Sequence, residues 1–365
     1  MSKIVRELDN YFDVIRDLAT EADEWQSRPS WLEFAPNNVC NLRCIMCAQS
    51  DGLPVVAMKR DEARALLGQV LPWITVWTPS ALSEPLLADF RMVLEECRKH
   101  DVFLNMYTNA TLTTGEKFRE MADRLHKLYI SFDSHVPEVF ERLRAKADFE
   151  SVLANVKEIL AAAAELQIPV GFVVVLMRDT VRTLPEYIDF IADIGGTAAR
   201  VDVRAQSLLG NTDECRELSF ESSMTDAEVC EFLDRAGERA VARGINFHIE
   251  GREPFYRNVS TVQPFMRWVT ADIQSQLIAN VQKNFPGFCY MAAMYMKIEP
   301  DGRVFPCCRG PEELLMGNVR ENTIEEIWNG ETYRTLRQRM RAGDYPEPCK
   351  GCDILEANPN FHKPE

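Results

Sequence analysis

The chain has 365 residues, of which 46% are hydrophobic and 27% charged. This is the composition of a folded globular protein, and it excludes a disordered chain, a collagen-like repeat and a small disulfide scaffold. Lys and Arg number 41 against 56 Asp and Glu, giving a formal net charge of −15, which argues against a nucleic-acid partner because an acidic surface repels phosphate.

The start of the chain carries charge from its third residue and lacks the apolar stretch of a signal peptide. The most apolar segment, 159–177, contains Glu165, Gln167 and Pro169, so it does not predict a membrane-spanning helix. We therefore expect a cytoplasmic protein without a membrane partner. The sequence has 11 cysteines, and a reducing cytoplasm gives disulfides little purpose, so grouped thiols indicate metal binding.

The hydrophobic pattern predicts an amphipathic helix over 4–18, then short apolar strands alternating with helical segments. The predicted strands cover 31–34, 74–77, 102–107, 128–132, 170–177 and 199–203, with a seventh apolar run at 245–249. The predicted helices cover 60–70, 88–99, 114–125, 151–166 and 184–194. This alternation predicts parallel strands joined by crossovers: an α/β fold with a partial (β/α)6 TIM-like parallel barrel.

The pattern changes after the last of these strands. A loop and a helical connector around 269–281 precede a region of short runs, Gly, Pro and paired cysteines, with one predicted helix over 324–341. Such a composition is typical of a small module organised by metal. We divide the chain into an N-terminal helix, the barrel, a connector and a small cysteine-bearing C-terminal domain, over 1–30, 31–255, 256–288 and 289–365.

The first group of cysteines, Cys40, Cys44 and Cys47, follows the first predicted strand directly. Three thiolates at this spacing can hold three irons of a four-iron cluster from one loop, which leaves the fourth iron open to another ligand. Zinc is the alternative, but it needs a fourth ligand, and no further His or Cys lies close in sequence.

This cysteine loop, placed after the first strand of a strand–helix series, resembles the radical S-adenosylmethionine (SAM) superfamily. Met46 stands where that family has an aromatic or bulky apolar residue. The resemblance implies that the open iron of a 4Fe-4S cluster binds SAM, and that an electron from the cluster cleaves SAM to a 5′-deoxyadenosyl radical that abstracts a substrate hydrogen. It also implies an electron donor such as flavodoxin or ferredoxin.

The same resemblance extends to the loop after the second strand. Where the family has Gly-Gly-Glu-Pro, this chain has Leu82-Ser83-Glu84-Pro85, so Glu84 and Pro85 match and both glycines are lost. Ser83 can still offer its backbone carbonyl. The resemblance implies that Ser83 and Glu84 contact SAM.

Three further residues at strand ends match family positions that contact SAM. Asn109 follows Thr108 as in the family's Thr-Asn-Gly, with Ala110 in place of glycine. Ser131 and Asp133 end the fourth strand, where the family presents polar groups to SAM; helix capping is the alternative role. All these positions lie at carboxyl ends of strands, where barrels build their sites.

The second group of cysteines lies near the end of the chain and consists of Cys289, Cys307, Cys349 and Cys352. Four thiolates converging from a small module can bind zinc or a second iron–sulfur cluster. The segment 299–307 and the helix before the final CxxC resemble the SPASM/twitch extension of radical SAM enzymes. The resemblance implies one auxiliary 4Fe-4S cluster, with Cys307 as the ligand and Cys308 as a buried thiol or an alternative ligand.

A fully ligated auxiliary cluster suits electron transfer. A carbinol that loses a hydrogen atom, a proton and an electron becomes a ketone, and the auxiliary cluster can accept that electron. The predicted function is therefore dehydrogenation of a small polar metabolite, such as a sugar or aminocyclitol in natural-product biosynthesis. Twitch-containing aminocyclitol dehydrogenases resemble this arrangement. The alternatives are a radical SAM epimerase or ribosomal-peptide maturase, and a zinc-stabilised, non-catalytic binding protein.

A peptide-recognition domain would not fit in the 30 residues before Trp31, which favours a small substrate, although such a domain can be a separate protein. The sequence does not identify a general base or a hydrogen donor. Polar residues after the sixth and seventh strands would face the barrel mouth, although each also fits a solvated loop. These residues are Arg204, Gln206, Glu250, Arg252 and Glu253.

Overall fold

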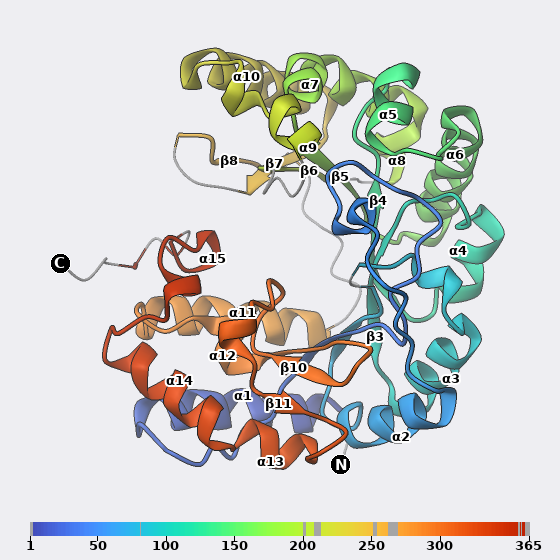
Figure 1. Cartoon of the computed structure of the whole chain (residues 1–365). Coiled ribbons are helices and arrows are strands. Elements are labelled where there is room, and N and C mark those ends of the chain that lie inside the picture. Colours follow the sequence, from blue (N-terminus) through green and yellow to red (C-terminus); the bar gives the residue numbers. More distant parts are fainter. Residues whose placement is uncertain are drawn as a thin grey trace.

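The structure is a computed structural model that describes residues 3–80, 82–199, 202–207, 213–250, 254–261, 269–356, 358 and 360–361. Within this part of the chain, eleven strands form one sheet in the order β11-β10-β9-β1-β2-β3-β4-β5-β6-β7-β8. Figure 1 shows the sheet curling round, with helices on its outer side. The strands are β1 (Trp31–Phe34), β2 (Val76–Thr78), β3 (Phe103–Thr108), β4 (Leu125–Ser131), β5 (Val170–Leu176), β6 (Asp202–Ser207), β7 (Asn246–Glu250), β8 (Arg257–Val259), β9 (Tyr295–Ile298), β10 (Arg303–Phe305) and β11 (Gly317–Asn318).

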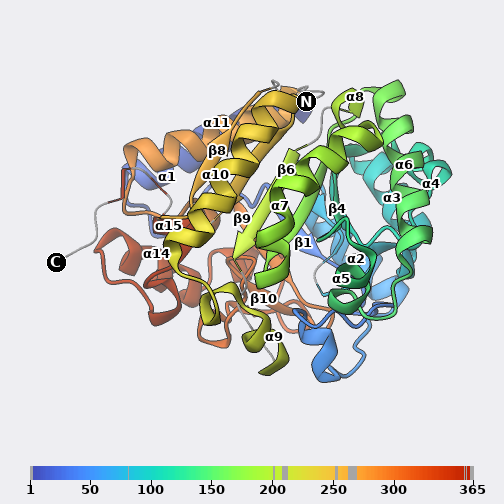
Figure 2. The same ribbon diagram turned by 90° about the horizontal axis from the view of Figure 1, so that it is seen from above.

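Most of the helices connect consecutive strands, as parallel strands require. Figure 2 shows α7 and α10 side by side over the later strands. No helix in the described part of the chain is long and apolar enough to cross a membrane. The helices are α1 (Lys3–Ala19), α2 (Arg60–Val70), α3 (Phe90–His100), α4 (Gly115–Met121), α5 (Pro137–Leu143), α6 (Phe149–Leu166), α7 (Arg178–Ile191), α8 (Thr197–Ala199), α9 (Asp213–Leu218), α10 (Asp226–Arg243), α11 (Val269–Asn284), α12 (Tyr290–Met294), α13 (Ile324–Trp328), α14 (Glu331–Arg341) and α15 (Asp353–Glu356).

Strands β1 to β7 pair in parallel, which confirms the predicted α/β fold with a partial parallel barrel. The sixth strand was misplaced: the prediction covered 199–203, whereas β6 spans Asp202–Ser207 because residues 197–199 form α8. The fourth strand begins at Leu125, so the predicted helix over 114–125 ends early, at Met121.

The single helix predicted over 324–341 is wrong, because the chain forms α13 and α14 with a break at Asn329 and Gly330. A capping box between Thr323 and Glu326 starts α13. At Gly330 the chain passes so close to α13 that a Cβ atom there would lie 2.8 Å from the Glu326 carbonyl oxygen. Only glycine fits this turn without a shift of the backbone.

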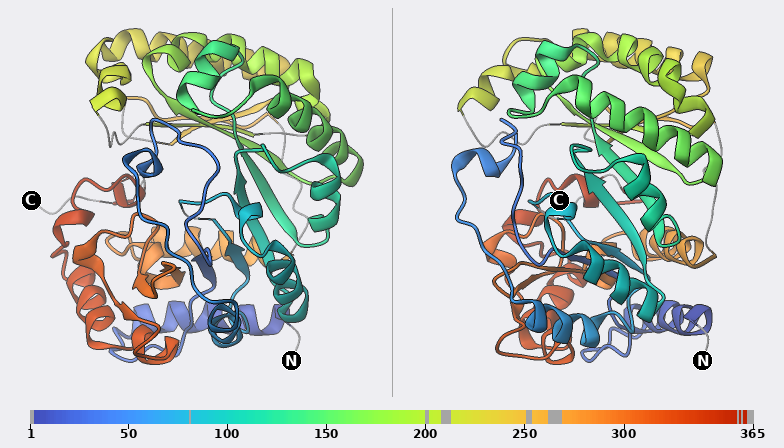
Figure 3. Two further views of the ribbon diagram at one scale, coloured as in Figure 1. Left: turned by 45° about the vertical axis from the view of Figure 1, so that its right-hand side comes forward. Right: turned by 90° about the vertical axis from the view of Figure 1, so that its right-hand side faces the viewer.

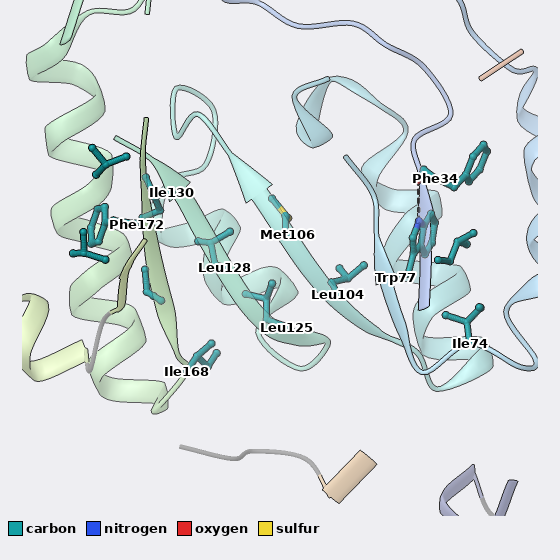
Figure 4. Close-up of a cluster of buried hydrophobic side chains, with 14 of the residues drawn as sticks. Phe34, Ile74, Trp77, Leu104, Met106, Leu125, Leu128, Ile130, Ile168 and Phe172 are labelled. Carbon is teal, nitrogen blue, oxygen red and sulfur yellow. Dashed lines mark hydrogen bonds between the residues drawn. The ribbon is translucent and has the colours of Figure 1, made fainter. Parts of the chain in front are cut away.

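Successive side chains of each strand point alternately into the hydrophobic core and into the inside of the barrel. Leu104, Met106, Leu128 and Ile130 are fully buried in the cluster drawn in Figure 4. Their neighbours in β3 and β4 instead line the barrel interior, as Tyr107 and Ser131 do. The same figure shows Trp77 Nε1 donating to the Phe34 carbonyl oxygen, at 2.8 Å, which ties β2 to β1.

The C-terminal module continues the barrel sheet. Strand β9 pairs in parallel with β1 and places Lys297 opposite Glu33, and β10 and β11 follow as antiparallel strands. The N-terminal segment packs on the same module: Trp328 Nε1 donates to the Ser27 carbonyl oxygen at 2.8 Å, and the Arg337 guanidinium lies 3.9 Å from the centre of the Trp25 ring. The two parts share one sheet, and the domain boundaries remain a prediction.

Candidate active site

The first three cysteines lie in the loop after β1, which passes in front of the curved sheet (Figure 3). Backbone hydrogen bonds from Arg43 to Ala145 and from Ile45 to Leu143 fix this loop against the end of α5. The cysteine side chains line a cavity of about 170 Å³. The predicted cluster ligands Cys40, Cys44 and Cys47 are thus brought together.

Polar side chains with unused hydrogen-bonding capacity face the same cavity. Ser80 is 6% exposed, and the hydroxyls of Ser80 and Ser83 are buried without a partner among the described residues. Asn109 and Ser131 also line the wall. Three thiols beside orphaned hydroxyls fit a cluster that keeps one iron open for a polar ligand such as SAM. Ser80 was missed by the sequence reasoning, because no family motif includes it.

Glu84 lies in this wall and is held by the end of β3. Its carboxylate accepts hydrogen bonds from Thr108 Oγ1 at 2.8 Å and from the Asn109 amide at 2.9 Å. Burial raises the pKa of Glu84 to about 7, although these hydrogen bonds oppose the shift. The Asn109 side-chain amide reaches Asn41 at 3.0 Å, so Glu84 and Asn109 connect β3 to the cysteine loop.

Asp133 does not line the cavity, contrary to what a direct SAM contact requires. Its carboxylate forms an ion pair with the Arg144 guanidinium at 2.6 Å and accepts a hydrogen bond from the Val175 amide at 2.8 Å. Arg144 does line the cavity, and its guanidinium lies 3.6 Å from Cys44 Sγ. Burial alone lowers the pKa of Arg144, but the Asp133 charge outweighs it and holds the guanidinium protonated. Asp133 therefore positions Arg144.

We expect Asp133→Asn to destabilise the protein by about 3 kcal/mol, because it leaves the Arg144 charge buried without its partner. Anaerobic urea unfolding of the reconstituted protein measures this change. The matched control is Glu120→Gln, which breaks the exposed pair with Lys117 and should cost less than about 1 kcal/mol. Equal losses in the two variants would contradict a structural role for the buried pair.

The second group of cysteines lines a separate cavity of about 260 Å³ in the C-terminal module. It brings together Cys289, Cys307, Cys349 and Cys352, all four of the predicted ligands. Backbone amides of Arg309 and Gly310 are directed at the Cys307 thiol, and hydrogen bonds of this kind tune the potential of iron–sulfur clusters. Cys308 does not line this cavity; it is exposed and faces the larger cavity next to it.

The chemistry of these thiols fits a metal centre. Burial raises the pKa of Cys289 to about 12 and that of Cys349 to about 11, so they become thiolates only when a metal charge stabilises them.

A third cavity of about 720 Å³ lies between the two cysteine groups. It shares Ser80, Tyr107, Ser131 and Arg144 with the first cavity, and Met291 with the second. Its volume is in the range of sites that enclose a small molecule or one side chain. Through these shared residues the cavity adjoins both cysteine-lined cavities.

One wall of this cavity comes from β1 and β9 and carries Glu33, Tyr295 and Lys297. None of the three was predicted as a site residue, because the pairing of β9 with β1 joins segments far apart in sequence. Arg204 lines the cavity as expected for a residue at the barrel mouth. The side chains of Gln206 and Glu250 lie outside the described residues, as do Arg252 and Glu253.

Two cysteine-lined cavities that adjoin a third, one at the partial parallel barrel and one in the C-terminal module, fit an enzyme that holds iron–sulfur clusters. Family profiles agree with this reading: the radical SAM superfamily matches residues 35–191, and SPASM, an iron-sulfur cluster-binding domain, matches residues 289–353. The chain belongs to the radical SAM superfamily and carries a SPASM domain. Its cofactors are SAM, the 4Fe-4S cluster that binds SAM, and an auxiliary 4Fe-4S cluster in the SPASM domain. The zinc-stabilised binding protein considered above is not supported.

The chain resembles a curated protein in sequence and solved structures in fold. The tungsten-containing aldehyde ferredoxin oxidoreductase cofactor-modifying protein of Pyrococcus furiosus is 21% identical over 87% of this chain and 85% of its own length. Among solved structures, Streptococcus suis SuiB bound to S-adenosylmethionine superposes with a TM-score of 0.62 and 15% identity, over 94% of this chain and 75% of SuiB. The protein anSMEcpe with bound AdoMet gives 0.58 and 15%, over 89% and 83% of the two chains.

Proposed function

We propose that this enzyme removes a hydrogen atom, a proton and an electron from a hydroxyl- or amine-bearing carbon of a small polar molecule, such as a sugar or aminocyclitol. The observation that carries the proposal is the cavity of about 720 Å³, which shares wall residues with the cysteine cavities on both sides. A substrate there is next to the source of the radical and next to an electron acceptor.

The two groups of cysteines hold two different clusters. Cys40, Cys44 and Cys47 hold the cluster that binds SAM. In the SPASM domain, Cys289, Cys307, Cys349 and Cys352 hold the auxiliary cluster. When bound, these groups supply a 5′-deoxyadenosyl radical on one side of the substrate and a one-electron acceptor on the other. The electron that starts the reaction comes from a donor such as flavodoxin or ferredoxin.

The wall residues of the first cavity bind and orient SAM. Ser83, Asn109 and Ser131 face the ligand, and Glu84 holds the Thr108–Asn109 turn in place. Ser80 adds a hydroxyl at the boundary between the SAM cavity and the substrate cavity. Arg144, held by Asp133, supplies a fixed positive charge beside Cys44.

Ser80→Ala is expected to weaken SAM binding about three- to tenfold, the effect of losing one hydrogen bond to a ligand. Equilibrium dialysis of the reconstituted enzyme with labelled SAM measures it. Ser27→Ala is the matched control, because the Ser27 hydroxyl is also buried and unpartnered among the described residues but lines no cavity named above. An unchanged affinity in Ser80→Ala would remove Ser80 from the site.

Peptide modification is the second candidate function. It is favoured by the structures that resemble this one, because SuiB was solved with the precursor peptide SuiA and anSMEcpe with a Cp18Cys peptide. In that case the cavity would take one side chain of a peptide.

The deciding experiment incubates reconstituted enzyme, SAM and dithionite with myo-inositol, D-glucosamine or 2-deoxystreptamine, each against a serine- and cysteine-containing peptide. Stimulated release of 5′-deoxyadenosine together with a carbonyl product from one of the three small compounds supports the dehydrogenase. Stimulation by the peptide alone, with a mass change in that peptide, would replace it with the maturase.

A further inference from the structure

The wall of the substrate cavity that faces the SPASM domain carries a carboxylate with no part in the cysteine sites. Glu33 lies in β1 and points to the interior of the barrel beside Trp31, whose ring lies 5.3 Å from that of Tyr295. Its side chain is 13% exposed. The carboxylate accepts a hydrogen bond from the Tyr295 hydroxyl, and both residues line the cavity.

The charged groups that face Glu33 come from β9 and the two loops beyond it. Lys297 Nζ lies 3.9 Å from the Glu33 carboxylate and 2.7 Å from that of Glu299, and it donates to the Cys308 carbonyl oxygen at 3.3 Å. The thiol of Cys308 faces the same cavity. The groups that act on the Glu33 carboxylate itself are Lys297 and Glu299 through their charges and Tyr295 through its hydrogen bond, and the Cys308 thiol in turn feels the charge of Glu33.

Burial raises the pKa of Glu33 to about 7, although the Lys297 charge and the Tyr295 hydrogen bond oppose the shift. A carboxylate with such a pKa can take a proton at neutral pH and release it again. Lys297 keeps its charge, because the two carboxylates outweigh the effect of burial on its pKa. The cluster is therefore a site that can bind one proton, placed in the cavity wall that adjoins the auxiliary cysteines.

We propose that Glu33 is the general base of the oxidation, and that it accepts the substrate proton as the electron passes to the auxiliary iron–sulfur cluster. This proposal rests on the dehydrogenase function given above. Once the C–H hydrogen has left, the O–H bond of the substrate radical breaks and an O–H bond forms on the Glu33 carboxylate. The remaining ketyl gives one electron to the oxidised cluster and becomes the carbonyl product. Atoms and charge balance, because one proton and one electron leave the substrate together.

The two transfers are linked through charge. An added electron on the cluster makes protonation of a carboxylate in the adjoining wall more favourable, by an amount on the order of one pKa unit. Above about pH 7 the oxidised protein carries Glu33 ionised, so reduction takes up a proton there. The reduction potential of the auxiliary cluster must then fall over about one pH unit above pH 7. It must be constant at lower pH, where Glu33 is protonated in both states, and at higher pH, where Glu33 is ionised in both.

The test is a spectroelectrochemical titration of the auxiliary cluster between about pH 6 and pH 9. The full-length chain carries Cys40→Ala, Cys44→Ala and Cys47→Ala, so only one cluster is seen; the holoenzyme with SAM bound serves as a second measurement. The parent should show a potential that is constant at low pH, falls above about pH 7 and becomes constant again about one pH unit higher. Adding Glu33→Gln should make it independent of pH.

Two matched variants separate this role from a structural one. Tyr295→Phe removes the hydrogen bond that stabilises the Glu33 carboxylate, so the inflection should move to higher pH. Glu299→Gln keeps Glu33 and should keep the pH dependence. The proposal is overturned if the parent potential does not vary with pH, or if Glu33→Gln follows the parent curve.

The outcome is separate from that of the proposed function. If only the peptide stimulates SAM cleavage, the dehydrogenase fails whatever the titration shows. If a hydroxylated compound is oxidised and the potential shows no dependence on Glu33, only the role of Glu33 fails.

Discussion

Replacing Cys40, Cys44 and Cys47 together by Ala is expected to reduce SAM cleavage to the level of a reaction without enzyme. The three thiols line the cavity beside Ser80 and Ser83, and no other cysteine of the described residues lines it. Without them the chain keeps its polar wall but has no thiolate to hold iron there. The measurement is 5′-deoxyadenosine formed under dithionite, quantified by chromatography.

Cys230→Ala is the control for the loss of a thiol as such. Cys230 is half-buried on α10, its thiol is directed at the Pro254 carbonyl oxygen, and it lines none of the cavities of the site. We expect this variant to cleave SAM at the parent rate. Cleavage retained in the triple variant would show that SAM is activated elsewhere and would contradict the site as described.

The second large effect is expected from Cys349→Ala combined with Cys352→Ala. These residues form one side of the cavity of about 260 Å³, and four thiolates are needed for a fully ligated cluster. The double variant should lose about four irons per chain and nearly all oxidised product, since the substrate radical has no acceptor. SAM cleavage should continue without coupling to product. Iron analysis and product assay on the same sample measure both.

Cys308→Ala is the matched control for iron content, because Cys308 is next to Cys307 in sequence but faces the substrate cavity. It should keep all the iron of the parent. If it loses as much iron as the double variant, Cys308 is a ligand, and the assignment of Cys307 alone is wrong.

The cysteine groups and the barrel could be predicted because each depends on local pattern. The spacing of Cys40, Cys44 and Cys47 after a strand, and the alternation of strands and helices, are visible within short windows of sequence. The strand ends were also informative: Ser83, Glu84, Asn109 and Ser131 all line the cavity that the cysteines line.

The rest depends on contacts between distant segments. Asp133 was predicted to contact SAM, but its carboxylate forms an ion pair with Arg144 instead. Such an ion pair beyond the end of β4 produces no periodic pattern in the sequence. Glu33 and Lys297 become neighbours only because β9 adds to the barrel sheet beside β1, more than 260 positions along the chain. The Asn329–Gly330 break between α13 and α14 was missed because the apolar pattern continues across it.

The most direct test of the account is the content of iron and acid-labile sulfide per chain after anaerobic reconstitution. It is measured for the parent and for the Cys40/Cys44/Cys47 triple Ala variant. Two four-iron clusters predict about eight irons in the parent and about four in the variant. About four irons in the parent, with zinc at the other cysteine group, would remove the electron acceptor and with it the dehydrogenase. Zinc without iron would contradict the radical mechanism altogether.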